Sequence, residues 1–128
     1  MNTCPMIEVV SCLITFGYTD DPDEQENKLH NFVYSNRKPL DQQYTTEGTQ
    51  PTWFMVGMKS VEKAPSAKNL RLPIFNNDNG VVTVTLPDKS LDTSSAGVEV
   101  DLGIAKLHFE VGAGKGTWEW GDNAKFHI

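Results

Sequence analysis

Three histidines are the side chains of this sequence best suited to acid–base or metal chemistry. They are His30, His108 and His127. If the last two lie on paired strands, their imidazoles share a solvent-facing surface with Glu110 and Glu119, where a histidine beside a carboxylate can transfer protons or bind zinc. A histidine on the polar face of a strand is usually only solvated. We therefore predict no catalytic residue and no metal site.

A pair of tryptophans gives the strongest indication of ligand binding. Trp118 and Trp120 are two positions apart, so on a strand both project from the same side of the sheet, with Glu119 on the other side. Two indoles about 6 to 7 Å apart can form a flat surface for a sugar ring, and the alternative is that both pack in the core. The predicted ligand-binding residues combine this strand with a polar loop and an asparagine-rich turn: Trp118, Trp120, Glu119, Asn77, Asp78 and Tyr44.

A glycine-rich hexapeptide raises the question of nucleotide binding. Gly112–Thr117 reads GAGKGT and is similar to part of the phosphate-binding loop of adenylate kinases. Phe109 occupies the position of that loop's first glycine, and the residues that follow are typical of a strand, whereas a phosphate-binding loop opens a helix. We therefore predict a flexible hairpin turn here and no cofactor.

An acidic run marks the start of the helix candidate. Residues 20–26 include five carboxylates, whose oxygens suit Ca²⁺, but the run lacks the ligand spacing and the glycine of a calcium-binding loop. Asp21 can cap a helix, Pro22 suits a first turn, and acidic side chains there favour the positive end of the helix dipole. The run therefore predicts one short helix near residues 22–34.

The chain from residue 51 onward has the patterns of strands. Thr52–Met58 is aromatic and apolar on both sides, which is typical of a covered central strand. Residues 70–86 alternate around Asn79–Gly80, which predicts a hairpin whose first arm, with Pro73, is an edge strand or contains a bulge. Val98–Val111 alternates apolar and polar residues with a change of phase at Gly103, which a β-bulge would explain, the alternative being a tight turn at Leu102–Gly103.

These patterns together predict a mostly β fold. Thr117–Trp120 and Ala124–Ile128 add two further strands, while the polar stretch Ser35–Gln50 is predicted to be a long surface connection. A chain of 128 residues has the length of one domain. We predict that residues 1–128 form a single antiparallel β-sandwich, or flattened barrel, of about 7–8 strands with the one short helix.

Charge and hydropathy limit the partners. Asp and Glu number 17 against 11 Lys and Arg, a net charge of -6, and such a surface repels nucleic acid. The apolar segment Met6–Phe16 has no basic residue before it and is interrupted by Glu8, so we interpret it as a strand and predict cytoplasmic synthesis without a signal peptide. No stretch is long enough for a membrane span. Cys4 and Cys12 are predicted to be thiols, with no disulfide.

The resulting functional prediction is a non-catalytic recognition module. It would bind a glycan in the manner of a lectin, through loops and aromatic residues at one end of the sandwich, and would not be an enzyme. The alternative is a small acidic protein–protein interaction protein, such as an inhibitor, an immunity factor or a viral accessory or structural protein, whose carboxylates face a basic partner. Self-association is predicted through the sheet edges.

Overall fold

The computed structural model describes residues 10, 12–18, 38–87, 97–121 and 123–128. Within these residues the chain forms two α-helices, two short 3-10 helices and five strands. Their order is η1 (Leu40–Gln42), β1 (Tyr44–Glu47), α2 (Thr52–Val61), η2 (Ala67–Asn69), β2 (Ile74–Asp78), β3 (Val81–Thr85), α3 (Gly97–Ala113), β4 (Thr117–Trp118) and β5 (Lys125–His127). The helix predicted near residues 22–34 and its acidic run lie outside the described residues.

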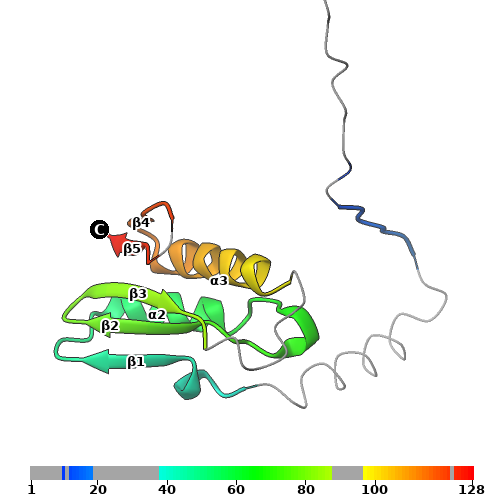
Figure 1. The fold of residues 1–128 in the computed structure, drawn as a ribbon. Helices are drawn as coiled ribbons and strands as arrows, with labels where there is room; N and C mark the ends of the chain where they lie inside the picture. Colours follow the sequence, from blue (N-terminus) through cyan, green and yellow to red (C-terminus); the bar gives the residue numbers. More distant parts are fainter. Residues whose placement is uncertain (1–9, 11, 19–37, 88–96, 122) are drawn as a thin grey trace, which may run out of the picture.

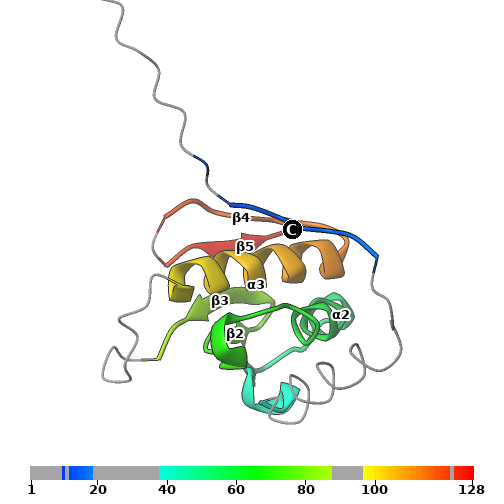
Figure 2. The same cartoon turned by 90° about the vertical axis from the view of Figure 1, so that its right-hand side faces the viewer.

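The strands form one mixed sheet in the order β1-β2-β3-β5-β4. The β1–β2 pair is parallel, and the other three pairs are antiparallel. Helices α2 and α3 pack beside each other against the sheet (Figure 1), and the view turned by 90° shows α3 lengthwise and α2 nearly end-on (Figure 2). The predicted mostly β sandwich of 7–8 antiparallel strands is therefore wrong, and the fold is mixed α and β.

Helix α2 replaces the predicted central strand Thr52–Met58. Pro51 is extended and its carbonyl accepts the amide of Phe54 at 3.0 Å, which starts the helix. The buried large side chains are Phe54, Met58 and Val61, at the i, i+4, i+7 spacing of one helical face. A short apolar run cannot be assigned from periodicity alone, because a buried helix and a buried strand both read as continuous apolar sequence.

Helix α3 replaces the predicted bulged strand Val98–Val111. Its buried residues are Asp101, Ala105 and Phe109, which recur every fourth position and form the face toward the sheet. The apparent change of phase at Gly103 arises because the helical period of about 3.6 residues does not stay in step with a two-residue alternation. The prediction failed because α3 is apolar on an exposed face as well as toward the core, so its polar face, with Glu99, Lys106 and Glu110, is narrow.

The hairpin prediction is confirmed. Strand β2 pairs with β3 from Ile74↔Thr85 to Asp78↔Val81. The turn residues Asn79 and Gly80 both have positive φ, 50° and 92°, which the Asn–Gly pair tolerates. The predicted edge position of its first arm is wrong, because Pro73 precedes β2 and β2 lies between β1 and β3.

The two ends of the sheet were predicted with different success. Ser35–Gln50 is not only a connection, because it contains η1 and the edge strand β1. The last two predicted strands are confirmed in shorter form as β4 and β5, which pair with Thr117 opposite His127 and Trp118 opposite Phe126. Neither α-helix of the described residues has the length and apolarity needed to cross a bilayer.

Phe109 is at the centre of the core. This α3 side chain is fully buried and stacks on Phe75 of β2, with ring centroids 5.1 Å apart. It also meets Phe126 of β5 edge-on at 5.1 Å and Phe54 of α2 at 5.7 Å. One ring therefore joins both helices to two strands of the sheet.

Two glycines let α2 and α3 approach closely. A Cβ on Gly57 would lie 2.8 Å from two ring atoms of Phe109. A Cβ on Gly112 would lie 2.4 Å from the Cβ of Ser60 and 3.1 Å from the Cα of Gly57. These distances are shorter than van der Waals contact, so larger residues at either position would push the helices apart.

Substitutions at two glycines of α3 are expected to have opposite effects. Gly112→Ala should lower the free energy of unfolding by about 1–3 kcal/mol, because the added methyl group overlaps α2. Gly103→Ala should raise it by about 0.5–1 kcal/mol, because a Cβ there meets nothing within 4 Å and alanine favours the helix. Urea unfolding measures both. Equal losses in the two variants would show that the approach of the helices is not the constraint.

Candidate functional site

A small pocket lies between the end of α2, the loop that follows it and the first half of α3. Its polar lining consists of Gln43, Ser66, Arg71 and Asp101, and Val61 and Ala105 contribute to its apolar wall. The pocket has room for about one water molecule. It brings a cation, a carboxylate, an amide and a hydroxyl from distant parts of the chain to one point.

The loop that lines the pocket is tied to α3 by a carboxylate. Both oxygens of Asp101 accept the amide N–H of Ala67, at 3.0 and 2.9 Å. Within the loop, Ser66 Oγ accepts the amide N–H of Arg71 at 3.1 Å. Asn69 and Arg71 have positive φ, 57° and 49°, so the loop turns sharply twice. These bonds fix the backbone that presents Ser66 and Arg71.

Arg71 brings a buried positive charge to the pocket. Its side chain is only 3 % exposed, and Nη2 donates to the carbonyl of Glu62, the residue that caps the end of α2. The last carbonyls of a helix carry partial negative charge, so this position favours a cation. The pocket therefore has a positive side held in a fixed place.

Gln43 has an unsatisfied polar atom. The residue is 2 % exposed, and its Oε1 has no hydrogen-bond donor among the described residues. Its own backbone carbonyl accepts the amide of Phe75 at 2.9 Å, which fixes the residue beside β2. A buried carbonyl oxygen without a donor costs about 1–3 kcal/mol, so a bound water or a ligand N–H or O–H group is expected at this atom.

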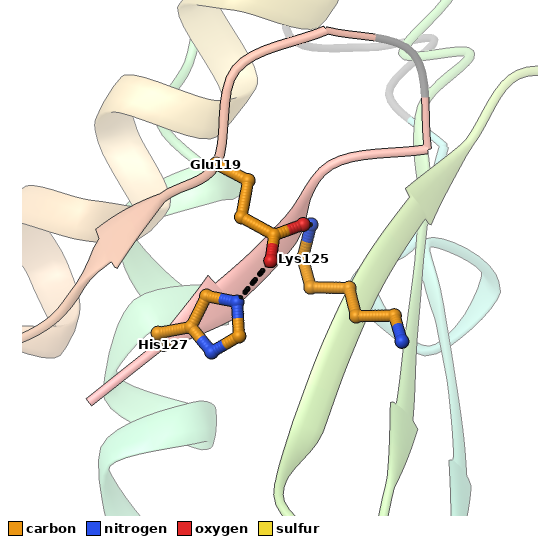
Figure 3. A network of polar contacts seen from close by, with 3 residues as sticks. All are labelled: Glu119, Lys125 and His127. Atoms are coloured by element: carbon orange, nitrogen blue, oxygen red, sulfur yellow. Dashed lines mark hydrogen bonds and ion pairs between the residues drawn. The ribbon is translucent and has the colours of Figure 1, made fainter.

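A second polar group lies at the far end of the sheet and is exposed. His127 Nε2 is 2.5 Å from Glu119 Oε1, and Glu119 Oε2 accepts the amide N–H of Lys125 at 3.1 Å (Figure 3). The hydrogen bond to His127, helped by the one from the Lys125 backbone, holds the pKa of Glu119 below its usual value near 4.5. Figure 3 shows the Lys125 ammonium turned away from the carboxylate.

The structure separates the other residues of the predicted histidine surface from this pair. His108 lies on α3, and its Nδ1 is 3.3 Å from the carbonyl of Ser60 on α2. Glu110 lies on α3 as well. The part of the chain that the structure describes contains no group of three or more His, Cys, Asp or Glu side chains able to hold a metal ion. His30 lies outside the described residues.

The two predicted ligand-binding tryptophans are in different environments. Trp118 packs against the core, its ring 5.7 Å from Phe109, and its Nε1 donates to the carbonyl of Lys106 at 3.0 Å. Trp120 is fully exposed. The pair therefore does not form a flat surface for a sugar, because only one of its two rings is accessible.

The other predicted ligand-binding residues lie at the opposite end of the sheet. Tyr44 packs edge-on against Phe54 at 5.7 Å. Asn77 is buried and stabilises the hairpin: its Nδ2 donates to the carbonyl of Thr49 and its Oδ1 accepts the amide of Gly80, both at 3.0 Å. Asp78 is exposed. Ligand binding by any of the six stays a prediction, but the fold does not gather them into one site.

The glycine-rich segment Gly112–Thr117 does not form a hairpin turn. It leads out of α3 and into β4, with positive φ at Gly114 and Gly116, 69° and 84°. A phosphate-binding loop has the opposite order, since its amides open a helix. The segment is therefore a helix-to-strand connection.

None of the four polar residues of the pocket was predicted to be a site residue. Arg71 was assigned to a hairpin arm and Asp101 to the polar face of a strand, so neither was considered as a site residue. One signal could have found Asp101, because it shares a four-residue spacing with Ala105 and Phe109 and so lies on an otherwise apolar helical face. No comparable signal places Gln43 against the loop.

The carboxylate of Asp101 is expected to stabilise the pocket loop. Asp101→Asn should lower the free energy of unfolding by about 1–2 kcal/mol. The asparagine side chain is uncharged and has only one oxygen, so one of the two oxygens that accept the Ala67 amide is lost together with the negative charge. Glu99→Gln, on the same helix but exposed, should change it by less than about 0.5 kcal/mol. Urea unfolding of both variants measures the difference, and equal effects would argue against a special role of the Ala67 contact.

The Glu119–His127 pair is expected to respond to acid. A carboxyl whose pKa is lower in the folded than in the unfolded state stabilises the fold above its usual pKa, and this contribution is lost as the pH falls through the lower, folded value. Carboxyl NMR should place the midpoint of Glu119 below 4.5. His127→Ala should move that midpoint upward. An unchanged midpoint would contradict the assignment of the shift to His127.

Comparisons with known proteins give one match. Residues 4–113 match the model of the family described as "Putative TM nitroreductase". No curated protein and no solved structure matches the chain. The matched residues include α2, the pocket loop and all of α3, which are the elements that form the pocket.

This match corrects the functional predictions. A lectin-like module, an acidic interaction protein and the absence of enzymatic activity were all predicted, and a family named for the reduction of nitro compounds contradicts all three. The lectin-like prediction also depended on a β-sandwich with a binding surface at one end, which the fold lacks. Since the matched residues make up most of the chain, the chain belongs to the TM nitroreductase family.

Proposed function

We propose that this protein takes part in the enzymatic reduction of nitro groups. The family match over residues 4–113 carries the proposal. Reduction of a nitro group to a nitroso group consumes two electrons and two protons and releases water. The proposal takes a reduced organic carrier of the flavin or nicotinamide class as the donor of these electrons.

The pocket fits a small polar group and not a ring system. Sites for whole cofactors have volumes of roughly 300–1,000 Å³, whereas this pocket holds about one water molecule. The described residues therefore do not enclose such a carrier. They can bind one small group, such as a single oxygen-bearing substituent of a substrate or of a carrier that lies mainly outside the pocket.

The pocket has one cation, Arg71, and one carboxylate, Asp101, whose oxygens both accept the Ala67 amide, and the Arg71 side suits an electron-rich oxygen group. Arg71 supplies positive charge, and a guanidinium pairs well with a planar group that has two oxygens. The Gln43 amide can donate through Nε2 and accept through Oε1. A nitro group meets the first requirement. A hydroxylamine, formed when the nitroso compound accepts two further electrons and two protons from the same carrier, has the N–H and O–H groups that meet the second.

Activity with a nitrobenzene derivative tests the proposal. The protein is mixed with the compound and reduced nicotinamide dinucleotide, with and without added flavin mononucleotide, and consumption of the nicotinamide is followed. We expect turnover, and in Arg71→Met a KM raised roughly tenfold, about 1.4 kcal/mol of lost binding. Arg71→Lys should retain more activity because it keeps the charge.

Lys63→Met is the matched control, since Lys63 is an exposed cation close to the same helix end. It should leave KM unchanged. Absence of turnover under all these conditions, or equal changes in KM for the Lys63 and Arg71 variants, would contradict the proposed function of the pocket.

A further inference from the structure

Gln43 brings to the pocket a hydrogen-bond acceptor that selects among ligands. Its side chain is 2 % exposed and lines the pocket, and no N–H or O–H group of the described residues donates to its Oε1. The backbone fixes the residue, because its amide donates to the carbonyl of Leu40 and its carbonyl accepts the amide of Phe75, each at 2.9 Å. A ligand group that fills the pocket must therefore donate to Oε1 or leave this oxygen buried and unpaired.

The charges of the pocket favour a neutral ligand group. Arg71 is its cation and Asp101 its carboxylate, and both residues are buried. A ligand anion would lie beside Asp101 and a ligand ammonium beside Arg71, where burial leaves the repulsion between like charges poorly screened. The pocket has room for about one water molecule, so the group that enters it is small as well as neutral.

A hydroxyl group meets these requirements better than a nitro group does. The oxygens of nitro and nitroso groups accept hydrogen bonds and donate none, so either group would leave Gln43 Oε1 unpaired. A hydroxyl group has a proton to donate, and its oxygen has lone pairs that the positive charge of Arg71 favours. Along the reduction from nitro to nitroso to hydroxylamine, a hydroxyl group on nitrogen first appears in the hydroxylamine.

Exchange of a ligand with water leads to the same order of affinities. A water molecule in the pocket can donate to Gln43 Oε1, and a ligand group that displaces such a water loses affinity unless it makes the same hydrogen bond. A hydroxyl group replaces the donor that the water supplied. A nitro oxygen does not.

We propose that the pocket binds a neutral N-hydroxy group more tightly than a nitro group, with the O–H donating to Gln43 Oε1. The choice of N-hydroxy compounds as the ligand class rests on the proposed function. Gln43 is the specificity-determining residue of the pocket, because its carbonyl distinguishes a hydroxyl oxygen from an oxygen without a proton. The hydroxylamine therefore competes with the nitro compound for the pocket and inhibits its reduction.

Binding without turnover tests the inference. N-Phenylhydroxylamine and nitrobenzene are each titrated into the full chain under argon without a reductant, so that neither compound is converted. The backbone amides of Ala67 and Arg71, which belong to the pocket loop, report binding through their NMR chemical shifts. The cost of an unpaired buried carbonyl predicts that wild type binds N-phenylhydroxylamine at least about tenfold more tightly than nitrobenzene.

Two glutamine variants separate the Gln43 carbonyl from other causes of a preference. Gln43→Met keeps a side chain of similar length without the acceptor, so the two dissociation constants should come within about threefold of each other. Gln42→Met is the matched control, because it makes the same substitution at the neighbouring, exposed glutamine. It should keep the preference of about tenfold. Far-UV circular dichroism checks that both variants are folded.

The inference is overturned by equal binding of the two compounds to wild type, by a preference that survives in Gln43→Met, or by failure of N-phenylhydroxylamine to bind. Turnover of nitrobenzene together with equal binding would overturn this inference and leave the proposed function in place. A preference that is lost in Gln43→Met but kept in Gln42→Met, in a protein without turnover, would support the inference and contradict the proposed function.

Discussion

The close approach of α2 and α3 is the constraint on which the rest of the structure depends. Gly57 and Gly112 remove the side chains that would keep the helices apart, and Phe109 fills the space over Gly57. From there its ring contacts Phe75 of β2 and Phe126 of β5. The contact between the two helices therefore also determines how α3 packs on the sheet. With the helices further apart, Phe109 could not contact α2 and β2 together.

The same approach positions the pocket. Helix α3 brings Asp101 to the loop that follows α2, where its two oxygens hold the Ala67 amide. The loop in turn presents Ser66 and Arg71, and β2 holds Gln43 through the backbone of Phe75. The candidate site therefore follows from the packing of two helices rather than from a local motif, which is why a motif search could not find it.

The sequence predicted the parts of the fold that local chemistry determines. The Asn79–Gly80 hairpin and the extended segments at Thr117–Trp118 and Lys125–His127 depend on turn residues and short separations, and both were predicted. Both helices were mistaken for strands. In α2 the apolar run is continuous, and in α3 the exposed Leu107 and Val111 hide the polar face.

The parallel pairing of β1 with β2 has a consequence for the order of folding. The β2–β3 hairpin closes across two residues, whereas Thr45 meets Asn76 only after the chain has crossed over through α2. Hairpins close in microseconds, but a parallel pair must wait until its connecting helix has docked. Strand β1 is therefore expected to join the sheet after the hairpin has formed, and Gln43, one residue before it, would leave the pocket whenever that edge opens.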